Sequence, residues 1–347
     1  MRNRPDQSML NRQSGFSMVE LMVAMTLGLL LTAAVLQAFV GAKQTYEFQQ
    51  EFSRIQENGR FAMEFLSRDI RQADYWGCLN DGVKVQSILN GSGGPDDFAA
   101  GLFGFDDVPE ASTGYHSFFG GQPDAITLQG GRLGGIPVIS TPSDSAANIK
   151  LDILNHPNGK AIDEGDILLV TDCTEAVIFQ VTNTQGANNT VVHQTGTQTP
   201  GNSQQGLDYS FGPDATVLEV SDIRYWIRKG VSGEPALIRG TRGDDWQTGG
   251  IELVEGVENL QILYGEDTSG NGSPNRFASA SSSIDMADVV SVQIHLVTRS
   301  LRDNLRQVDD AHIEDLLVDY NGGPKSSNDR RLRKVFMSTI AIRNRLD

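Results

Sequence analysis

The fold of this chain is decided by the stretch GFSMVEL at residues 15–21, which runs into LMVAMTLGLLLTAAVL at residues 21–36. Between residues 16 and 40 one side chain is ionisable, that of Glu20. With its flanks the apolar run has about 20 residues, the length that crosses a bilayer as a helix. The pattern predicts a transmembrane helix over about residues 18–40.

The charges around this run predict its orientation. Arg2, Arg4 and Arg12 precede it, and basic residues stay on the cytoplasmic side of a membrane. The body of the chain then lies outside the inner membrane. The alternative is an ordinary secretory signal peptide that is removed after the apolar run. A carboxylate within the run and a helical pattern that continues beyond it both argue against a removed signal.

The helical pattern extends well past the apolar run. No proline occurs between residues 6 and 94, and apolar or small residues recur at spacings of three, four or seven. These positions are Phe48, Phe52, Ile55, Gly59, Ala62, Leu66 and Ala73. The spacing predicts one helix from about Met18 to Ala73, apolar in its first half and amphipathic in its second.

From Tyr75 onward the pattern changes to short β-like runs separated by glycine-rich turns, which predicts an α+β fold with a mostly antiparallel sheet. We expect long surface loops at residues 90–123 and 183–215 and a further loop at 321–330. The predicted strands are 125–129, 166–171, 176–182, 189–194, 216–228, 236–239, 257–264, 289–298 and 335–343. The formal net charge of −16 argues against nucleic acid as a partner.

The run GFSMVEL resembles the processing site of type IV prepilins. The resemblance implies that a prepilin peptidase cuts between Gly15 and Phe16 and methylates the new N-terminus at Phe16. Glu20 matches the glutamate that pairs with the cationic N-terminus of a neighbouring subunit. A carboxylate at this depth costs a few kcal/mol, which such a partner offsets.

The head adds motifs that are similar to minor pilins of the PilW type, which are related to J-type minor pseudopilins of type II secretion. The resemblance implies a leader at 1–15, an N-terminal helix at 16–74 and a β-rich head at 75–347. The matching elements are Trp76-Gly77-Cys78, Gly165-Asp166 with Asp172-Cys173, residues 253–260 with Tyr264-Gly265, and Arg343-Asn344.

The resemblance also implies a function. It indicates a non-catalytic minor pilin that primes type IV pilus assembly and sits in or near the tip complex, with links to cell adhesion and twitching motility. Its expected partners are other minor pilins, the major pilin, the prepilin peptidase and inner-membrane lipid. Before assembly the chain would cross the inner membrane once, with its head in the periplasm; afterwards it would lie at the extracellular tip. The alternatives are a J-like minor pseudopilin of a secretion system and a tip module that presents an adhesin.

The chain has two cysteines, Cys78 and Cys173. The predicted topology places both in an oxidising compartment, where one disulfide between them is expected. The alternative is two unrelated buried thiols.

The segment from Asp267 to Ser273 resembles a degraded calcium loop. Its candidate ligands are Asp267, Ser269, Asn271 and Ser273, because oxygen atoms at alternate positions converge on a hard cation. Position twelve is Ala278 instead of a bidentate glutamate. The pattern therefore favours a plain Asx-turn loop without a cofactor, and calcium is the alternative.

Motifs for other functions are weak. The histidines show no metal-binding spacing, and neither a nucleophile elbow nor a phosphate loop occurs. The basic run at 330–334 could contact an acidic neighbour or a lipid headgroup. A solvated start to the last strand is the more common arrangement for such a run.

Overall fold

The computed structural model describes residues 15–346 except 80–82, 84, 92–97, 116, 118–120, 133, 141–147, 153–161, 186–188, 197, 281–282 and 304–328. The chain divides into two units, residues 1–50 and residues 51–347. Helix α1 (Met18–Gln72) contributes to both units.

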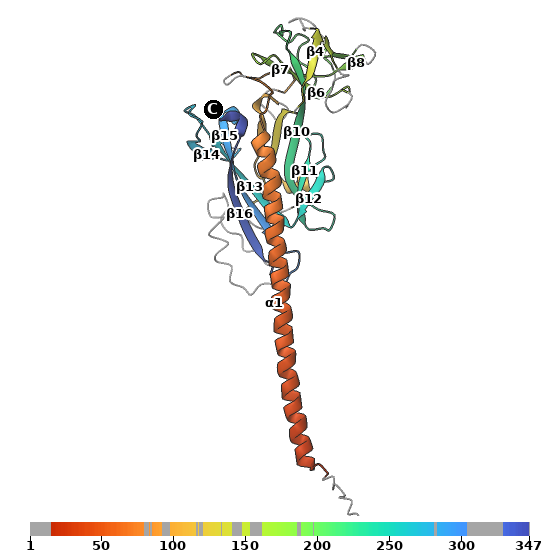
Figure 1. The fold of residues 1–347 in the computed structure, drawn as a ribbon, viewed down its shortest axis with the longest axis vertical. Helices are drawn as coiled ribbons and strands as arrows, with labels where there is room; N and C mark the ends of the chain where they lie inside the picture. The colour runs from red at the N-terminus through yellow and green to blue at the C-terminus, as the bar shows by residue number, and fades with distance from the viewer. Residues whose placement is uncertain are drawn as a thin grey trace, which may run out of the picture. The chain divides into compact units, whose positions relative to one another are not determined.

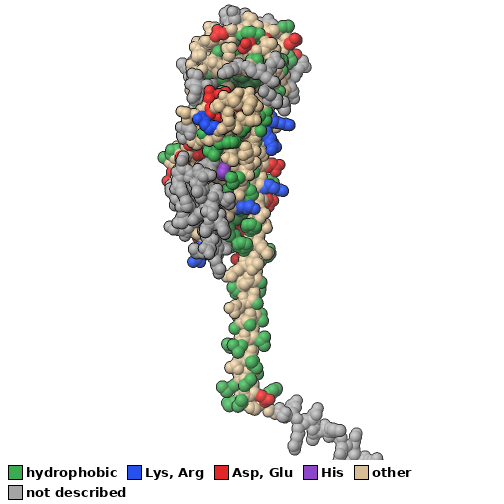
Figure 2. Space-filling model, turned by 90° about the vertical axis from the view of Figure 1, so that its left-hand side faces the viewer, with side chains coloured by type: hydrophobic (Ala, Val, Ile, Leu, Met, Phe, Trp, Pro, Cys, Tyr) green, Lys and Arg blue, Asp and Glu red, His purple; other side chains and the backbone are tan. Residues whose placement is uncertain are grey.

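In the first unit α1 is apolar, and its side chains are exposed. The apolar window of α1 has no buried residue, and among the described residues α1 is the one helix long and apolar enough to cross a membrane. Hydrophobic side chains surround this part of the helix in Figure 2. Exposed side chains of this composition require apolar surroundings, which a lipid bilayer provides.

In the second unit the rest of α1 packs against β-sheet. Of the positions that the spacing predicted, Ile55, Gly59, Ala62 and Leu66 are buried, whereas Phe48 and Phe52 are exposed; Ile70 is buried in addition. Ala62, Leu66 and Ile70 join one core with residues of two sheets, including Tyr225, Leu237, Ile262 and Leu296. Figure 1 shows strands of the two sheets on either side of this part of α1. Burial of one helical face by tertiary packing is the main source of helix stability in a globular domain.

The larger sheet has twelve described strands. Its strands are β1 (Gln86–Ser87), β2 (Leu102–Phe105), β3 (Ala125–Gly131), β4 (Ile136–Ser140), β5 (Asn148–Leu151), β6 (Ile167–Thr171), β7 (Ala176–Gln180), β8 (Asn183–Gln185), β9 (Thr190–Val192), β10 (Thr216–Lys229), β11 (Pro235–Gly240) and β12 (Ile251–Glu255). The smaller sheet is β14 (Arg276–Ala278), β13 (Val257–Glu266), β15 (Val289–Arg299) and β16 (Arg333–Ala341), in that order. Short helices are η1 (Phe98–Ala100), α2 (Glu110–Thr113), η4 (Met286–Asp288) and η5 (Arg343–Arg345).

Strand β10 connects two parts of the larger sheet. Its first residues pair with β6 and β4, and the rest of the strand pairs with β3 and β11. The two parts have separate cores: β5, β6, β7 and β9 enclose one, and β3, β10 and β11 face α1. Strand β1 runs parallel to β7, and every other described strand pair is antiparallel. The predicted α+β fold is therefore confirmed.

Nine strands were predicted, and β1, β2, β4, β5, β8, β12 and β14 were not, although β4 and β5 lie inside the larger sheet. Each predicted run overlaps a strand of the structure. The predicted loop at 90–123 contains β2 and α2, however, and the loop at 183–215 contains β8 as well as the expected β9. Strand β2 has four residues, with Gly104 among them, so its alternation is too short to stand out from a loop. Most of the loop predicted at 321–330 lies outside the described residues.

Candidate assembly site

The predicted processing junction lies just before α1. Gly15, Phe16 and Ser17 precede the first helical residue, Met18. Among the described residues no atom lies within 4 Å of the position that a Cβ on Gly15 would take, and Phe16 is 85% exposed. The leader residues 1–14 lie outside the described residues. Cleavage and methylation at Gly15 and Phe16 remain predictions, and the open backbone at Gly15 is compatible with access by a peptidase.

Ser17 and Glu20 form a variant of the capping box at the start of α1, in which the Ser17 hydroxyl accepts from the second helical residue instead of the third. The backbone N–H of Ser17 donates to Glu20 Oε2 at 3.2 Å, and the N–H of Val19 donates to Ser17 Oγ at 3.2 Å. Such a box satisfies N–H groups that the first helical turn leaves open. Within the described part of the chain, no cation pairs with Glu20. The Glu20 carboxylate therefore accepts one hydrogen bond from its own chain. Among the described residues it lacks the cationic partner that the resemblance implies.

The hydroxyl groups of the apolar half are satisfied within the helix. Thr26, Thr32 and Thr45 donate to carbonyls of the preceding turn, at Met22, Gly28 and Gly41, over 2.8–3.0 Å. A polar group in hydrocarbon needs an internal partner of this kind. The threonines thus cost little in a membrane, whereas Glu20, the one ionisable residue between residues 16 and 40, is expensive to bury in lipid.

The structure joins Cys78 and Cys173 in a disulfide, which confirms that prediction. Cys78 follows α1 by a few residues, and Cys173 lies in the turn between β6 and β7. The bridge therefore links the segment after the helix to the part of the head whose core lies among β5, β6, β7 and β9. Asp172 holds the same turn by accepting from the N–H groups of Thr174 and Glu175 at 3.2 Å.

Polar contacts pin the end of α1 to the head. The buried carboxylate of Asp69 accepts from the Tyr225 hydroxyl at 2.7 Å and from Arg239 Nε at 3.0 Å. The amide of Asn344 donates to the carbonyl of Ala73 at 2.8 Å. Arg345 pairs with Asp74 at 2.6 Å. The first of these joins α1 to β10 and β11, and the last two join the helix end to the chain's C-terminal turn.

The interpretation of the basic run at 330–334 as a solvated strand start was wrong for Arg331 and Arg333. Arg333 and Glu258 are both fully buried, and their closest N–O distance is 2.5 Å. Arg299 also pairs with Glu258, at 3.1 Å, and reaches Glu234 at 2.7 Å. Arg331 donates to Glu234 at 3.0 Å. Arg331 and Arg333 thus serve an ion network inside the head, and neither is a solvated cation.

Two other buried groups have strongly shifted pKa values. Burial raises the pKa of Asp124 to about 8, although the N–H groups of Asp107 and Ile262 donate to it and oppose the shift. Burial lowers the pKa of His193 to about 4, with smaller opposing effects of nearby backbone. His193 is fully buried and its ring lies 4.8 Å from that of Phe179. In both cases burial favours the neutral form of the group.

The loop at 267–273 has the geometry of an Asx turn. Asp267 Oδ1 accepts from the N–H groups of Ser269 and Gly270 at 2.9 and 2.8 Å, and Oδ2 accepts from the N–H of Gly272 at 2.6 Å. Asn271 Oδ1 accepts from the N–H of Ser273 at 2.9 Å. Because these contacts use the carboxylate internally, the geometry supports the plain loop. Among the residues that the structure describes, no three His, Cys, Asp or Glu side chains gather as metal ligands. Calcium binding, the alternative for this loop, remains untested.

The sequence did not reveal the buried hydrogen bonds and ion pairs of the head. The pairs of Asp69 with Tyr225 and of Glu258 with Arg333 are separated by 156 and 75 residues. The one available signal was the density of arginines at 330–334, which does not show where their partners lie.

Comparison with known proteins agrees with the N-terminal and C-terminal motifs. A family model described as type IV pilus-assembly protein W matches residues 224–344. A model described as the prokaryotic N-terminal methylation motif matches residues 10–36. No curated protein matches the chain. A solved type IV-like pilin, TTHA1219 from Thermus thermophilus, has 13% sequence identity, covers 62% of this chain and 87% of its own, and has a TM-score of 0.21. At that TM-score the match supports no conclusion about this chain.

Proposed function

Because the chain is a type IV pilin-like protein of the PilW type that carries the prepilin methylation motif, we propose that it is a low-copy minor pilin that primes pilus assembly and stays in or near the pilus tip. Proteins of this family are structural and not catalytic. Its N-terminal apolar helix anchors the chain in the inner membrane before assembly. Its priming role and its place at the tip form the proposal.

The observation that carries the proposal is the size of the head. The unit Glu51–Asp347 contains a twelve-stranded and a four-stranded sheet. A shaft repeats one subunit in a head-to-tail arrangement, at a small rise per subunit. A head of this size would collide with its own copies in such a lattice. One or a few copies at an end avoid the collision, because nothing packs beyond them.

Glu20 supplies the second part of the proposal. Cleavage after Gly15 would create a cationic amine at Phe16 on each subunit that enters the filament. In the described residues Glu20 has the N–H of Ser17 as its partner, so its charge is available for a neighbour's amine. This supports other minor pilins and the major pilin as direct partners, the prepilin peptidase as the processing enzyme, and inner-membrane lipid as the surroundings of the helix before assembly. A tip adhesin is a further candidate partner.

The test is removal of the gene followed by complementation. We expect fewer surface filaments with unchanged levels of major subunit in the membrane, and recovery with the wild-type gene. Immunogold labelling of the head should mark filament ends. Regular labelling along the shaft, or a normal number of filaments without the gene, would contradict the proposal. Mass analysis of the mature N-terminus provides a separate check of processing, since it should show N-methylated Phe16.

A further inference from the structure

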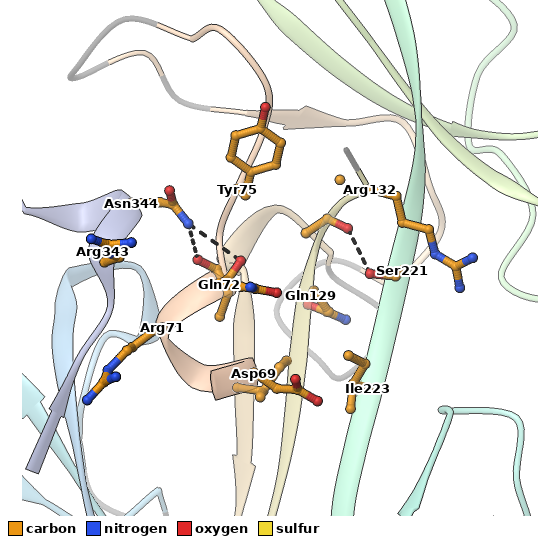
Figure 3. Close-up of a pocket in the computed structure, with 14 residues that line it drawn as sticks. Asp69, Arg71, Gln72, Tyr75, Gln129, Arg132, Ser221, Ile223, Arg343 and Asn344 are labelled. Atoms are coloured by element: carbon orange, nitrogen blue, oxygen red, sulfur yellow. Dashed lines mark hydrogen bonds between the residues drawn. The ribbon is translucent and has the colours of Figure 1, made fainter. Parts of the chain in front are cut away.

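A pocket lies in the head where α1 ends. It has a volume of about 330 Å³ and is shown in Figure 3. The end of α1, strands β3 and β10 and the C-terminal turn contribute its lining. Leu128, Ile223, Gly130 and Gly131 provide apolar or side-chain-free surface, and Tyr75 lies at one end. The pocket therefore offers space and apolar contact for one side chain of a partner.

The sides of this pocket are basic, although the chain as a whole has a net charge of −16. Arg71, Arg132 and Arg343 contribute to its lining, and all three are exposed. Figure 3 shows Arg71 and Arg343 on one side and Arg132 on the other. Arg132 has a loose contact with Glu219 at 3.6 Å. Within the described residues no carboxylate pairs with Arg71 or Arg343, so the pocket lies between two sources of available positive charge.

The negative groups near this pocket already have hydrogen-bond or ion-pair partners within the head. Asp69 accepts from Tyr225 at 2.7 Å and from Arg239 at 3.0 Å, which neutralises its charge. The last carbonyls of a helix carry partial negative charge. Here Asn344 donates to the carbonyl of Ala73 at 2.8 Å and more weakly to that of Gln72. An incoming anion would therefore meet arginines and little opposing charge.

We propose that this pocket binds an acidic protein segment, which places one apolar side chain against Leu128 and Ile223 and its carboxylates on Arg71 and Arg343. Arginine binds carboxylates in a bidentate manner, and exposed pairs at an interface contribute mainly specificity and association rate. An acidic peptide fits better than a nucleic acid, because it brings an apolar side chain for Leu128 and Ile223 together with carboxylates for the arginines. The assignment of this segment to a neighbouring pilus subunit rests on the proposed function; the binding chemistry does not.

The binding test uses the full chain in detergent micelles and a fluorescent peptide that alternates glutamate and leucine. We expect saturable binding that weakens with salt and weakens further when glutamine replaces glutamate in the peptide. The double variant Arg71→Gln/Arg343→Gln should bind about tenfold more weakly, since it loses two exposed ion pairs. Arg60→Gln is the matched control, because Arg60 is an exposed arginine of the same helix that does not line the pocket. Equal binding by the double variant and the control would overturn the proposal.

Two further measurements separate the possible failures. Tryptophan fluorescence should show that the double variant keeps a folded head; if peptide affinity then remains at the wild-type level, the arginines are not the site. A short single-stranded DNA that displaces the peptide and binds more tightly would identify a polyanion site and would also overturn the proposal. In cells, the double variant should lose filaments while its leader is still cleaved. If deletion of the gene has no effect on filaments but the peptide still binds, the proposed function is contradicted. The proposal that the pocket binds an acidic segment is then still supported.

Discussion

Replacing Gly59 with alanine tests a close contact of α1 with the smaller sheet. Gly59 is buried, and a Cβ at that position would collide with three ring carbons of Phe336 in β16. Alanine gains about 1 kcal/mol of helix propensity over glycine, whereas overpacking of a fitted core costs about 1–3 kcal/mol. The ring of Phe336 is half-buried and can move at the expense of its contacts. We therefore expect the free energy of unfolding of the head to fall by about 1 kcal/mol.

The assay is urea unfolding of the full chain in detergent, followed by tryptophan fluorescence. The chain has 3 tryptophans, and Trp76, Trp226 and Trp246 all lie in the head unit, so the signal reports on the head alone. Gly41→Ala is the control, because a Cβ there meets nothing within 4 Å and the residue lies in the other unit. It should leave the transition unchanged.

A second substitution shows whether the ring is the cause. Adding Phe336→Leu to Gly59→Ala should cost less than the sum of the two single changes, because the smaller side chain makes room for the new methyl group. A transition midpoint for Gly59→Ala at or above that of the wild type would show that the ring moves without cost, and the proposed close packing would be refuted.

Four further predictions concern the disulfide between Cys78 and Cys173, Glu20, His193 and the loop at 267–273. Cys78→Ser should lower the head's free energy of unfolding by roughly 4–5 kcal/mol in the chain-entropy model, since the bridge to Cys173 closes a loop of 95 residues; two alkylatable thiols in the native protein would contradict the bridge. Glu20→Ala should leave membrane insertion and leader cleavage intact and reduce incorporation into filaments; wild-type incorporation would refute the pairing. Because the folded pKa of His193 is lowered to about 4, its unfolded form binds the proton first, so stability should fall between about pH 6.5 and pH 4 by roughly 3 kcal/mol. His193→Leu should flatten that part of the profile, and an identical pH dependence in both proteins would argue against the assignment. Calcium should leave the urea midpoint unchanged if the contacts of Asp267 are those of a plain Asx turn; a rise that Asp267→Ala abolishes would show that the loop binds the ion.

Strand β15 shows how much of the structure a local sequence pattern can predict. Val292, Ile294 and Leu296 alternate with more polar residues, and the structure buries all three beside the helix. The alternation is a property of neighbouring residues, and only one face of the strand can turn toward the core. The pairing of β15 with β13 and β16 is not encoded locally in this way. Many strands of similar length and composition compete as partners.

The same limit applies to charged residues. Arg331 and Arg333 look like neighbours in a solvated run, yet each has an acidic partner far away in the sequence. A charge is tolerated inside a protein only when such a partner is present. Whether it is present depends on which strands become neighbours, and that is decided when the head folds.

The sequence by itself determined the parts of this protein that depend on local chemistry. An apolar run of membrane-spanning length, a carboxylate near its start and a helical spacing that continues to residue 73 follow from adjacent residues and their solvation, as does the predicted cleavage at Gly15. The tertiary structure alone decided which carboxylates are buried, that Gly59 faces Phe336, and that arginines distant in the sequence flank one pocket at the end of α1. These features depend on contacts between distant segments, whose geometry is set by the packing of the whole head.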